Sequence, residues 1–280
     1  MPNSDPSQKI AGKKLTMTPL NYLSAARFKG VDAASFLHTQ VSADIAALAT
    51  GEASFACYCS PKGKVIGLLL ICRRDDDFIM VAASELLPRI LERLKIFVMR
   101  AHVEFSVQPD LAVQGATAES DVVVTDAFRP AGLPLNYAFL ENTANGTGES
   151  FKAEELLNQV AWLGEATTEK YIPQMLGFDQ IGAVSFSKGC YPGQEIVARA
   201  RYLGKVKRKP VVVEVAENLP VQPLDRVEVL RENEWQPGII VDSVPVSGGG
   251  LLLFVVAPAE PEASVVELKY QDRVYRCATM

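Results

Sequence analysis

The order of strand-like and helix-like segments between residues 53 and 107 is the feature that most restricts the fold. Two apolar runs of strand length, 53–60 and 64–72, are joined by Pro61-Lys62-Gly63, which has the composition of a hairpin turn. A further strand is expected at 78–83, an amphipathic helix at 85–100 with Ser84 as its N-cap, and a strand at 102–107. This order predicts an α+β fold and fits a ferredoxin-like lobe.

The rest of the chain predicts further domains, because 280 residues exceed the usual size of one core. Helical spacing of apolar residues covers 30–48, and a second helix is expected at 152–163. Strands are expected at 111–115, 122–127 and 135–140, followed by a loop at 141–150. Beyond Arg208 only short β runs occur, at 210–215, 226–230, 238–242, 251–256 and 265–270. Their Pro and Gly punctuation predicts a small C-terminal β-barrel.

Composition and charge restrict the class of protein. The net charge of −5 argues against a protein whose whole surface binds nucleic acid, although it leaves room for a local basic patch. No apolar run reaches the roughly 20 residues that span a bilayer, and the N-terminus lacks the apolar core of a signal peptide. These features predict a soluble, cytoplasmic protein without a membrane partner.

The five cysteines, an odd number without a Cys-x-x-Cys pair, suit reduced thiols better than a disulfide framework. Cys57 and Cys59 lie on one face of a strand, where buried core thiols are the favoured interpretation. With only His38 and His102 in the chain, a zinc site has little support. An iron–sulfur cluster needs four well-placed ligands, and the cysteine spacing does not support one. No metal site is therefore predicted.

One nine-residue stretch has the composition of a functional loop. It reads Ser187-Lys188-Gly189-Cys190-Tyr191-Pro192-Gly193-Gln194-Glu195. A nearby lysine or a helix N-terminus favours the thiolate form of a cysteine, and a helix is expected to begin at Gln194-Glu195. The two glycines allow positive φ and a close approach of the backbone to a ligand. The Cys190 thiol is either buried in a turn or functional, and Lys188 and the glycines favour a functional role. Hydrolytic chemistry is not expected, because no histidine is near in sequence.

This stretch resembles the signature of the YgfZ-type folate-binding proteins, which are relatives of the glycine-cleavage T-protein, an aminomethyltransferase. The signature residues are Lys188, Gly189, Cys190, Tyr191, Gly193, Gln194 and Glu195. Looser matches precede it, and together they extend the resemblance from about Leu20 to the end of the chain. They comprise the 30–44 segment with its Gly-x-Asp, Phe-Leu and Gln-x-Ser-x-Asp groups, the hairpin Ser60-Pro61-Lys62-Gly63-Lys64, Ile172-Pro173 and Gly177-Phe178-Asp179.

The resemblance implies a T-protein-like ring of domains with tetrahydrofolate bound in the channel where the domains meet. It divides the chain into a polar, disordered leader (1–18), a discontinuous folate-binding-type domain (19–50 and 111–206), a ferredoxin-like inserted lobe (51–110) and the barrel (207–280). In that family the signature cysteine is associated with redox or iron–sulfur-linked function. The implied partners are iron–sulfur enzymes or assembly factors, including enzymes that modify tRNA.

Several candidate ligand contacts have a structural alternative. Tyr191 is either a flat wall for a pterin ring or an aromatic spacer in the core. Gln194 and Glu195 either contact the aminopyrimidine edge of the pterin or form a capping box at the helix start. A basic run follows, and it offers Arg199 and Arg201 for the carboxylate tail of folate. The same run is otherwise a solvated face or, with weaker support, an RNA contact. Its members are Arg199, Arg201, Lys205, Lys207, Arg208 and Lys209.

One departure from the T-protein pattern bears on catalysis. Alignment of the first hairpin places Ile66-Gly67 where the T-protein carries the Asp-Asp pair that supplies its essential carboxylate. Neither residue accepts a proton. The nearby Asp75-Asp76-Asp77 is expected to form a solvated turn. The sequence therefore predicts a folate-binding accessory protein without aminomethyltransferase activity. The alternatives are a one-carbon transferase with a relocated carboxylate, or a thiol protein for which folate is incidental.

Overall fold

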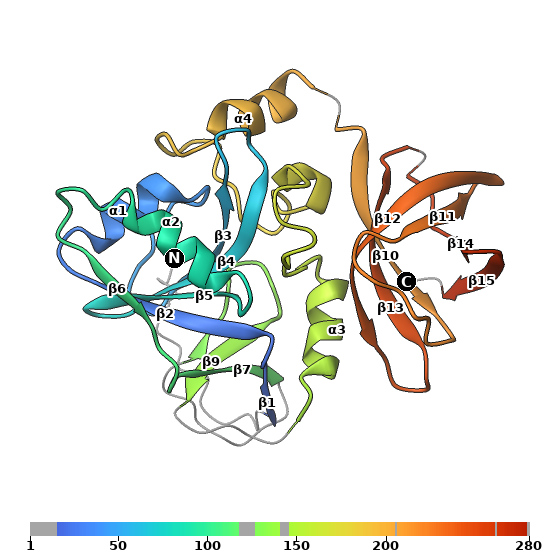
Figure 1. The fold of residues 1–280 in the computed structure, drawn as a ribbon, viewed down its shortest axis with the longest axis horizontal. Coiled ribbons are helices and arrows are strands. Elements are labelled where there is room, and N and C mark those ends of the chain that lie inside the picture. The colour runs from blue at the N-terminus through green and yellow to red at the C-terminus, as the bar shows by residue number, and fades with distance from the viewer. Residues whose placement is uncertain (1–15, 118–126, 141–145, 205, 261, 279–280) are drawn as a thin grey trace, which may run out of the picture.

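The computed structural model describes residues 16–117, 127–140, 146–204, 206–260 and 262–278. It consists of a larger body built on two sheets and a separate closed barrel, with helix α3 (Glu149–Leu157) between them (Figure 1). Helix α4 (Gln194–Tyr202) lies at the top of the body in this view, and the chain passes from it into the barrel. The mixed α/β architecture and the C-terminal barrel confirm the predicted fold class.

The five-stranded antiparallel sheet of the body forms from the most apolar part of the sequence. Its strand order is β3-β4-β5-β2-β6, and nearly every side chain of β3, β4 and β5 is buried, as expected for a sheet covered on both faces. The strands are β2 (Leu23–Lys29), β3 (Ala53–Cys59), β4 (Val65–Arg73), β5 (Asp77–Ala83) and β6 (Glu104–Val107). Cys57 and Cys59 lie inside it as predicted, and burial raises the pKa of Cys59 to about 12.

This sheet differs from the predicted division into domains. Strand β2 hydrogen-bonds between β5 and β6, so residues 23–29 belong to the same sheet as the 51–110 lobe. Asp77, expected in a solvated turn, is buried at the start of β5 and paired with Arg27 on β2. Burying an unpaired carboxylate is costly, so the β2 pairing also explains how Asp77 is tolerated there.

The second sheet of the body contains four strands in the order β1-β7-β9-β8. They are β1 (Thr16–Pro19), β7 (Ala112–Thr117), β8 (Ala127–Phe128) and β9 (Asn136–Leu140). Residues 16–18, predicted as part of a disordered leader, form β1 and pair with β7. The rest of that leader, most of the predicted strand at 122–127 and the first half of the predicted loop at 141–150 lie outside the described residues.

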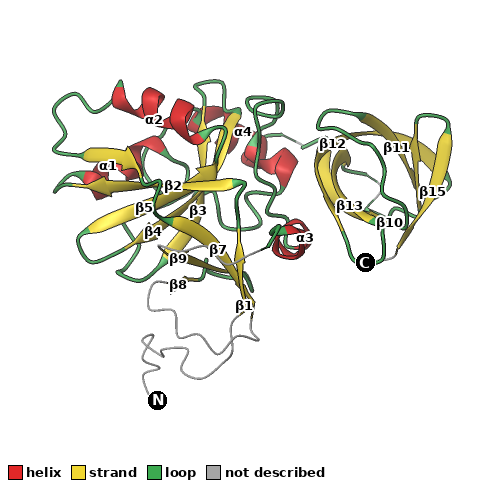
Figure 2. Ribbon diagram, turned by 60° about the horizontal axis from the view of Figure 1, so that its bottom comes forward, coloured by secondary structure: helices red, strands yellow, loops and turns green. Residues whose placement is uncertain are grey.

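The C-terminal domain is a closed antiparallel barrel with the strand order β10-β13-β12-β11-β14-β15, seen at the right of Figure 2. It has its own apolar core, separate from that of the body. The strands are β10 (Arg208–Val215), β11 (Arg226–Arg231), β12 (Glu234–Pro245), β13 (Leu251–Pro258), β14 (Glu267–Tyr270) and β15 (Arg273–Ala278). Closure leaves no free sheet edge, which is why runs of only four to twelve residues suffice for a stable unit.

The helices are shorter than the apolar periodicity predicts. The helix expected at 30–48 is α1 (Ala33–Gln40), and the one expected at 85–100 is α2 (Leu87–Lys95). Ser84 is not its N-cap: the Ser84 hydroxyl accepts from Ser24, and α2 begins after Leu86 with Pro88 in its first turn. The helix expected at 152–163 is α3, which starts earlier, at Glu149, and ends at Leu157.

A short 3-10 helix, η1 (Pro173–Leu176), precedes the signature and packs against both α4 and β10. None of the described helices combines the length and the apolar character that crossing a membrane requires.

Candidate functional site

The signature loop is fastened to the end of helix α1 by Lys188. Its ammonium donates hydrogen bonds to the carbonyl oxygens of His38 and Val41, the latter at 2.7 Å. The last carbonyls of a helix lack partners within the helix, and a lysine that satisfies them also complements the helix dipole. Lys188 therefore acts as a C-terminal cap supplied from 150 residues away in sequence.

The ammonium of Lys188 is enclosed. The residue is only 8% exposed, and its nitrogen lies 5.2 Å from the ring centre of Tyr191, within cation–π range. Burial lowers the pKa of Lys188 to about 8, while Asp44 and Cys190 act in the opposite direction. The lysine thus remains mostly charged at pH 7.

The signature also packs against the first hairpin through two glycines. Gly193 has a φ of +82°, and a Cβ there would lie 2.7 Å from the Cα of Gly63 and 2.4 Å from the carbonyl oxygen of Ser60. Gly63, in the hairpin turn, has a φ of +69°, and its own Cβ would lie 2.7 Å from the Cβ of Ile196. Only glycine at both positions permits this approach of the two backbones.

Ser42 links the segment after α1 to strand β3 and to the residues that precede the signature. Its hydroxyl donates to the carbonyl of Ala183 at 2.5 Å and accepts from the backbone N–H of Cys57 at 2.8 Å. The backbone of Ser42 also receives a hydrogen bond from Ser185 at 2.9 Å. The 30–44 segment, strand β3 and the approach to the signature are thereby held together by one buried residue.

Cys190 is exposed at the outer side of this assembly. The neighbouring Gly189 faces His38, since a Cβ at Gly189 would lie 4.0 Å from His38 Nε2. The other ring nitrogen, Nδ1, lies 3.2 Å from Asp44 Oδ1. Nδ1 also accepts a hydrogen bond from the backbone N–H of Ala46 at 3.4 Å, so a neutral imidazole does not donate to this carboxylate. The fold thus brings a histidine and a carboxylate to the thiol loop that sequence proximity did not reveal.

A pocket of about 650 Å³ lies where the body, α3 and the barrel meet. We call it the junction pocket. Its lining residues are Tyr22, Ala83, Ser84, Glu85, Lys152, Trp162, Gly164, Glu165, Ala166, Thr167, Gln222, Pro223, Val241 and Asp242. Lys152 on α3 bonds to Asp242 on the barrel at 2.6 Å and lies 5.6 Å from the ring centre of Tyr22. Asp242 follows a register irregularity in β12, the kind of bulge that re-aims a side chain.

A buried carboxylate lies beneath this pocket. Glu155 accepts hydrogen bonds from the hydroxyls of Tyr22 at 2.6 Å and Tyr137 at 2.7 Å, and from the indole of Trp162 at 2.9 Å. Burial raises the pKa of Glu155 to about 7, although these three donors and Lys152 favour the charged form. The network fixes the aromatic side chains that border the pocket.

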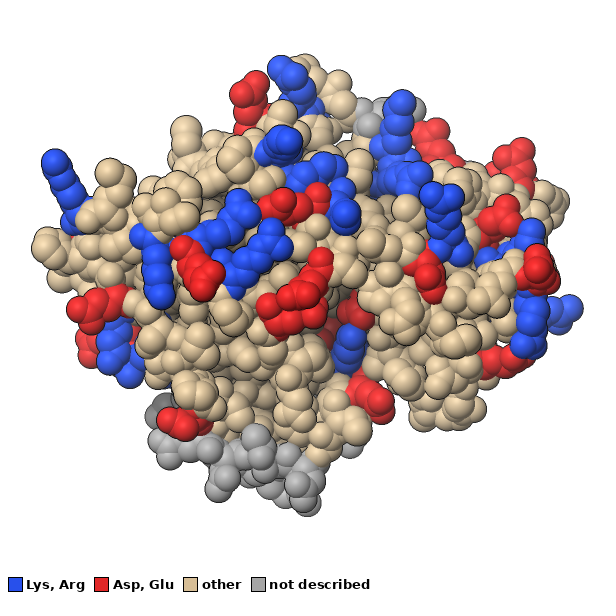
Figure 3. Space-filling model, viewed as in Figure 1, with Lys and Arg blue, Asp and Glu red and all other residues tan. Residues whose placement is uncertain are grey.

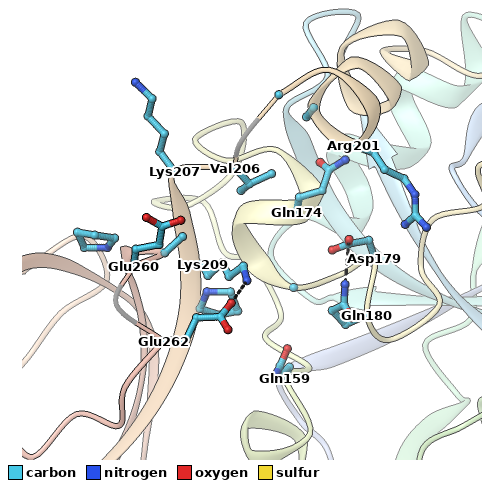
Figure 4. Close-up of a pocket in the computed structure, with 16 residues that line it drawn as sticks. Gln159, Gln174, Asp179, Gln180, Arg201, Val206, Lys207, Lys209, Glu260 and Glu262 are labelled. Carbon is cyan, nitrogen blue, oxygen red and sulfur yellow. Dashed lines mark hydrogen bonds and ion pairs between the residues drawn. The ribbon is translucent and has the colours of Figure 1, made fainter. Parts of the chain in front are cut away.

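A second depression, of about 740 Å³, lies between the signature helix and the barrel (Figure 4). We call it the α4–barrel cleft. Cations and carboxylates line it together: Arg201, Lys207 and Lys209 face Asp179, Glu260 and Glu262, with three glutamine amides between them. Lys209 is paired with Glu262 at 2.8 Å. The cleft is therefore close to neutral and suits a ligand with both donors and acceptors.

Comparison with known proteins places the chain in a group of homologues. No family model matches it. It is 28% identical over 277 residues to the tRNA-modifying protein YgfZ of Klebsiella pneumoniae, covering 86% of this chain and 85% of that protein. It is 28% identical over 225 residues to the tRNA-modifying protein YgfZ of Vibrio atlanticus, covering 71% and 70%. A Haemophilus influenzae protein of unassigned function is 28% identical over 228 residues, covering 79% and 81%.

The chain is a homologue of the YgfZ proteins. The fold agrees with this relationship. The glycine cleavage system aminomethyltransferase T of Bartonella henselae superposes with a TM-score of 0.66, covering 95% of this chain and 85% of that one, at 12% identity. The likeness is one of fold. The comparisons thus confirm the predicted resemblance to YgfZ in sequence and to the T-protein in fold.

The position aligned with the T-protein carboxylate pair is closed in this YgfZ homologue. Ile66 is completely buried in β4, and a Cβ on Gly67 would lie 2.9 Å from the Cδ1 of Ile90 on α2. A carboxylate at Gly67 would have to displace that side chain and lose its hydration. The helix that covers the sheet fills the space, so this strand offers no acid.

The residues predicted to bind folate in this YgfZ homologue do not converge on one described pocket. Tyr191 is 7% exposed and packs under Lys188. The Gln194 amide donates to the Lys188 carbonyl at 3.4 Å, and Glu195 is exposed beside Arg199 at 3.7 Å. Glu195 forms no capping box, because the N-cap is Gly193, which has no side chain. Arg201 alone lines a cleft, the one between α4 and the barrel. The folate assignment of these five residues stays a prediction.

The residues of the junction pocket were not predicted from the sequence, because they come from six separate segments. A weak signal was present: Glu155 occurs on a helix whose other buried positions are Phe151 and Leu156, so its side chain points inward. Among the described residues, no three His, Cys, Asp or Glu side chains come together as a metal site would require.

Proposed function

We propose that this protein binds a reduced folate and supports iron–sulfur enzymes, including those that modify tRNA, in the cytoplasm. The proposal rests on the similarity to tRNA-modifying proteins and on the signature that ends in Glu195. The observation that carries it is the junction pocket, which lies where three parts of the fold meet and combines an aromatic wall with carboxylates and a cation.

The chemistry of the junction pocket suits a pterin with a glutamate tail. The aminopyrimidine edge of a pterin carries adjacent N–H donors, and a carboxylate accepts both. Glu85 and Asp242 border the pocket and supply carboxylates, and the ring of Tyr22 supplies a flat apolar surface. Lys152 adds a positive charge for the tail. A pocket of about 650 Å³ lies within the range of small-molecule sites.

Replacing Tyr22 by alanine is expected to weaken binding of 5-formyltetrahydrofolate about tenfold, because it removes the aromatic wall and releases one donor of the Glu155 network. Asp242→Asn is expected to have a similar effect, since the amide does not accept both pterin donors. Isothermal titration calorimetry measures both. The matched control is Glu195→Gln, a carboxylate that lies exposed on α4.

The control also decides between two placements of the ligand. Weaker binding in Glu195→Gln together with unchanged binding in Tyr22→Ala would move the folate to the signature. Absence of saturable binding in the folded wild-type protein would refute folate binding altogether.

A one-carbon transferase is the second candidate. One observation favours it: Asp242 and Glu85 supply carboxylates to the junction pocket, whereas Ile66-Gly67 supply none. Incubation with an aminomethyl donor and tetrahydrofolate tests this directly. We expect no methylene-tetrahydrofolate, because Asp242 is needed for the aminopyrimidine edge of the pterin and its Oδ1 also bonds to Lys152 at 2.6 Å. Turnover that disappears in Asp242→Asn would establish the transferase instead.

A further inference from the structure

Helix α4 presents most of its surface outward. Of its nine residues only Val197 is buried, and it holds the helix against η1. At its C-terminal end Tyr202 is 66% exposed and Leu203 is 83% exposed. Soluble proteins do not often leave a large aromatic residue so open beside charged groups, so this end of the helix has the character of a contact surface.

Positive charge is concentrated on the same segment. Residues 196–213 contain no carboxylate and six lysines or arginines. Arg199 has only a long 3.7 Å contact with Glu195 within the helix, a geometry that contributes little in solvent. Lys207 is exposed at the rim of the α4–barrel cleft. Figure 3 shows lysine and arginine gathered on the upper part of this face, over α4 and the start of β10. The patch stands out in a protein of net charge −5.

Aromatic and cationic groups alternate on this surface. The guanidinium of Arg201 lies 4.1 Å from the ring centre of Phe186, and the Phe186 ring meets that of Tyr202 edge-on at 6.1 Å. Arg201 thus contacts the face of Phe186 and remains exposed. Planar cations and aromatic rings in this arrangement are the groups on which unpaired nucleobases stack.

The cleft beside the helix contains an unsatisfied acceptor. Gln174, 6% exposed, donates through Nε2 to the carbonyl of Val197 at 2.7 Å. That bond fixes the orientation of the amide, and its oxygen, which is buried, has no hydrogen-bond partner among the described residues. A buried acceptor of this kind costs free energy until a ligand or water supplies a donor. Gln174 is one of the residues that line the cleft in Figure 4.

We propose that α4 and the α4–barrel cleft bind single-stranded RNA, with one base in the cleft. The inference rests on the proposed function in tRNA modification and names its contact surface. Arg199 and Lys207 contact phosphates, Tyr202 stacks a base, and an exocyclic amino group donates to Gln174 Oε1. The carboxylates of the cleft favour this ligand over a simple polyanion, because they accept from base amino groups but repel isolated anions.

Fluorescence anisotropy with a labelled 12-nucleotide RNA and an unmodified tRNA transcript tests the inference. Tyr202→Ala is expected to weaken binding about five- to tenfold, the lower end of the effect of losing one stacked base. Lys207→Ala is expected to lower the slope of log affinity against log salt by about 0.7, the value for one phosphate contact on a single strand. Arg273→Ala is the control, since Arg273 lies on β15, across the barrel from α4 (Figure 1), and should change neither.

Three results would overturn the inference: no RNA binding at 50 mM salt, the same loss in Arg273→Ala as in Tyr202→Ala, or equal competition by heparin or duplex RNA. Folate titration of the same preparations separates this inference from the proposed function. Intact folate binding without RNA binding removes only the RNA surface. RNA binding without folate binding removes only the folate proposal.

Discussion

Replacing Cys190 by serine is expected to abolish the proposed support of iron–sulfur enzymes in cells, with the stability and the proposed folate affinity nearly unchanged. A thiolate is a nucleophile and a soft metal ligand, and a serine hydroxyl is neither. Cys190 is exposed, so the exchange of sulfur for oxygen leaves no cavity. The buried ammonium of Lys188 and the His38–Asp44 pair remain in place around it.

Complementation of a deletion strain measures this effect, with the activity of an iron–sulfur tRNA-modifying enzyme as the readout. We expect activity at the level of the deletion, at least tenfold below wild type. Cys277→Ser is the matched control: Cys277 is half-buried in the barrel, and burial raises its pKa to about 11, so it is not a thiolate at neutral pH. Full activity of Cys190→Ser would exclude the thiol as the working group.

The stability of the protein is expected to fall by about 3 kcal/mol as the pH rises from 4.5 to 7, through the titration of Glu155 alone. Burial raises the pKa of this carboxyl from 4.5 to about 7. Between these values the folded chain keeps a proton that the unfolded chain has lost, so folding is favoured at the acidic end. Above pH 7 both states are ionised, and this contribution stays constant.

Urea unfolding at pH 5 and pH 8 measures the difference, and Glu155→Gln should flatten it because the amide does not titrate. The tyrosine hydroxyls that donate to Glu155 can rotate to accept from the amide, so the variant is expected to fold. Glu195→Gln, on an exposed carboxylate, should leave the pH dependence unchanged. An unaltered profile in Glu155→Gln would show that the carboxyl titrates in its ordinary range.

Local patterns were sufficient to predict some elements. Gly193 before Gln194-Glu195 marks the start of α4, since a glycine with positive φ stops the preceding turn and the helix follows directly. The short β runs after Arg208 predict the barrel, because their length and punctuation leave few other ways to bury both faces.

Long-range contacts were not predictable in the same way. Helix α1 ends at Gln40, where Val41 becomes extended and bridges to Tyr58 and where Lys188, far along the chain, caps the last carbonyls, although the apolar periodicity continues past that point. The Glu155 network joins a helix to Tyr22, 133 residues away, and a single glutamate on a helix ordinarily indicates a solvated position. The signature pointed to the relatives that the comparison found, whereas the pockets depend on which distant segments lie next to one another in the fold.

The contact between Gly63 and Gly193 makes the hairpin turn and the signature loop a single packed unit. A side chain on Gly193 would collide with Ser60 and Gly63 of the hairpin, and one on Gly63 would collide with Ile196 of α4, so a change at either position disturbs both segments. If the nine-residue signature were grafted onto another scaffold, it would therefore lack the hairpin turn against which it packs. The hairpin would have to be transferred together with the signature for Cys190 to keep its exposed position.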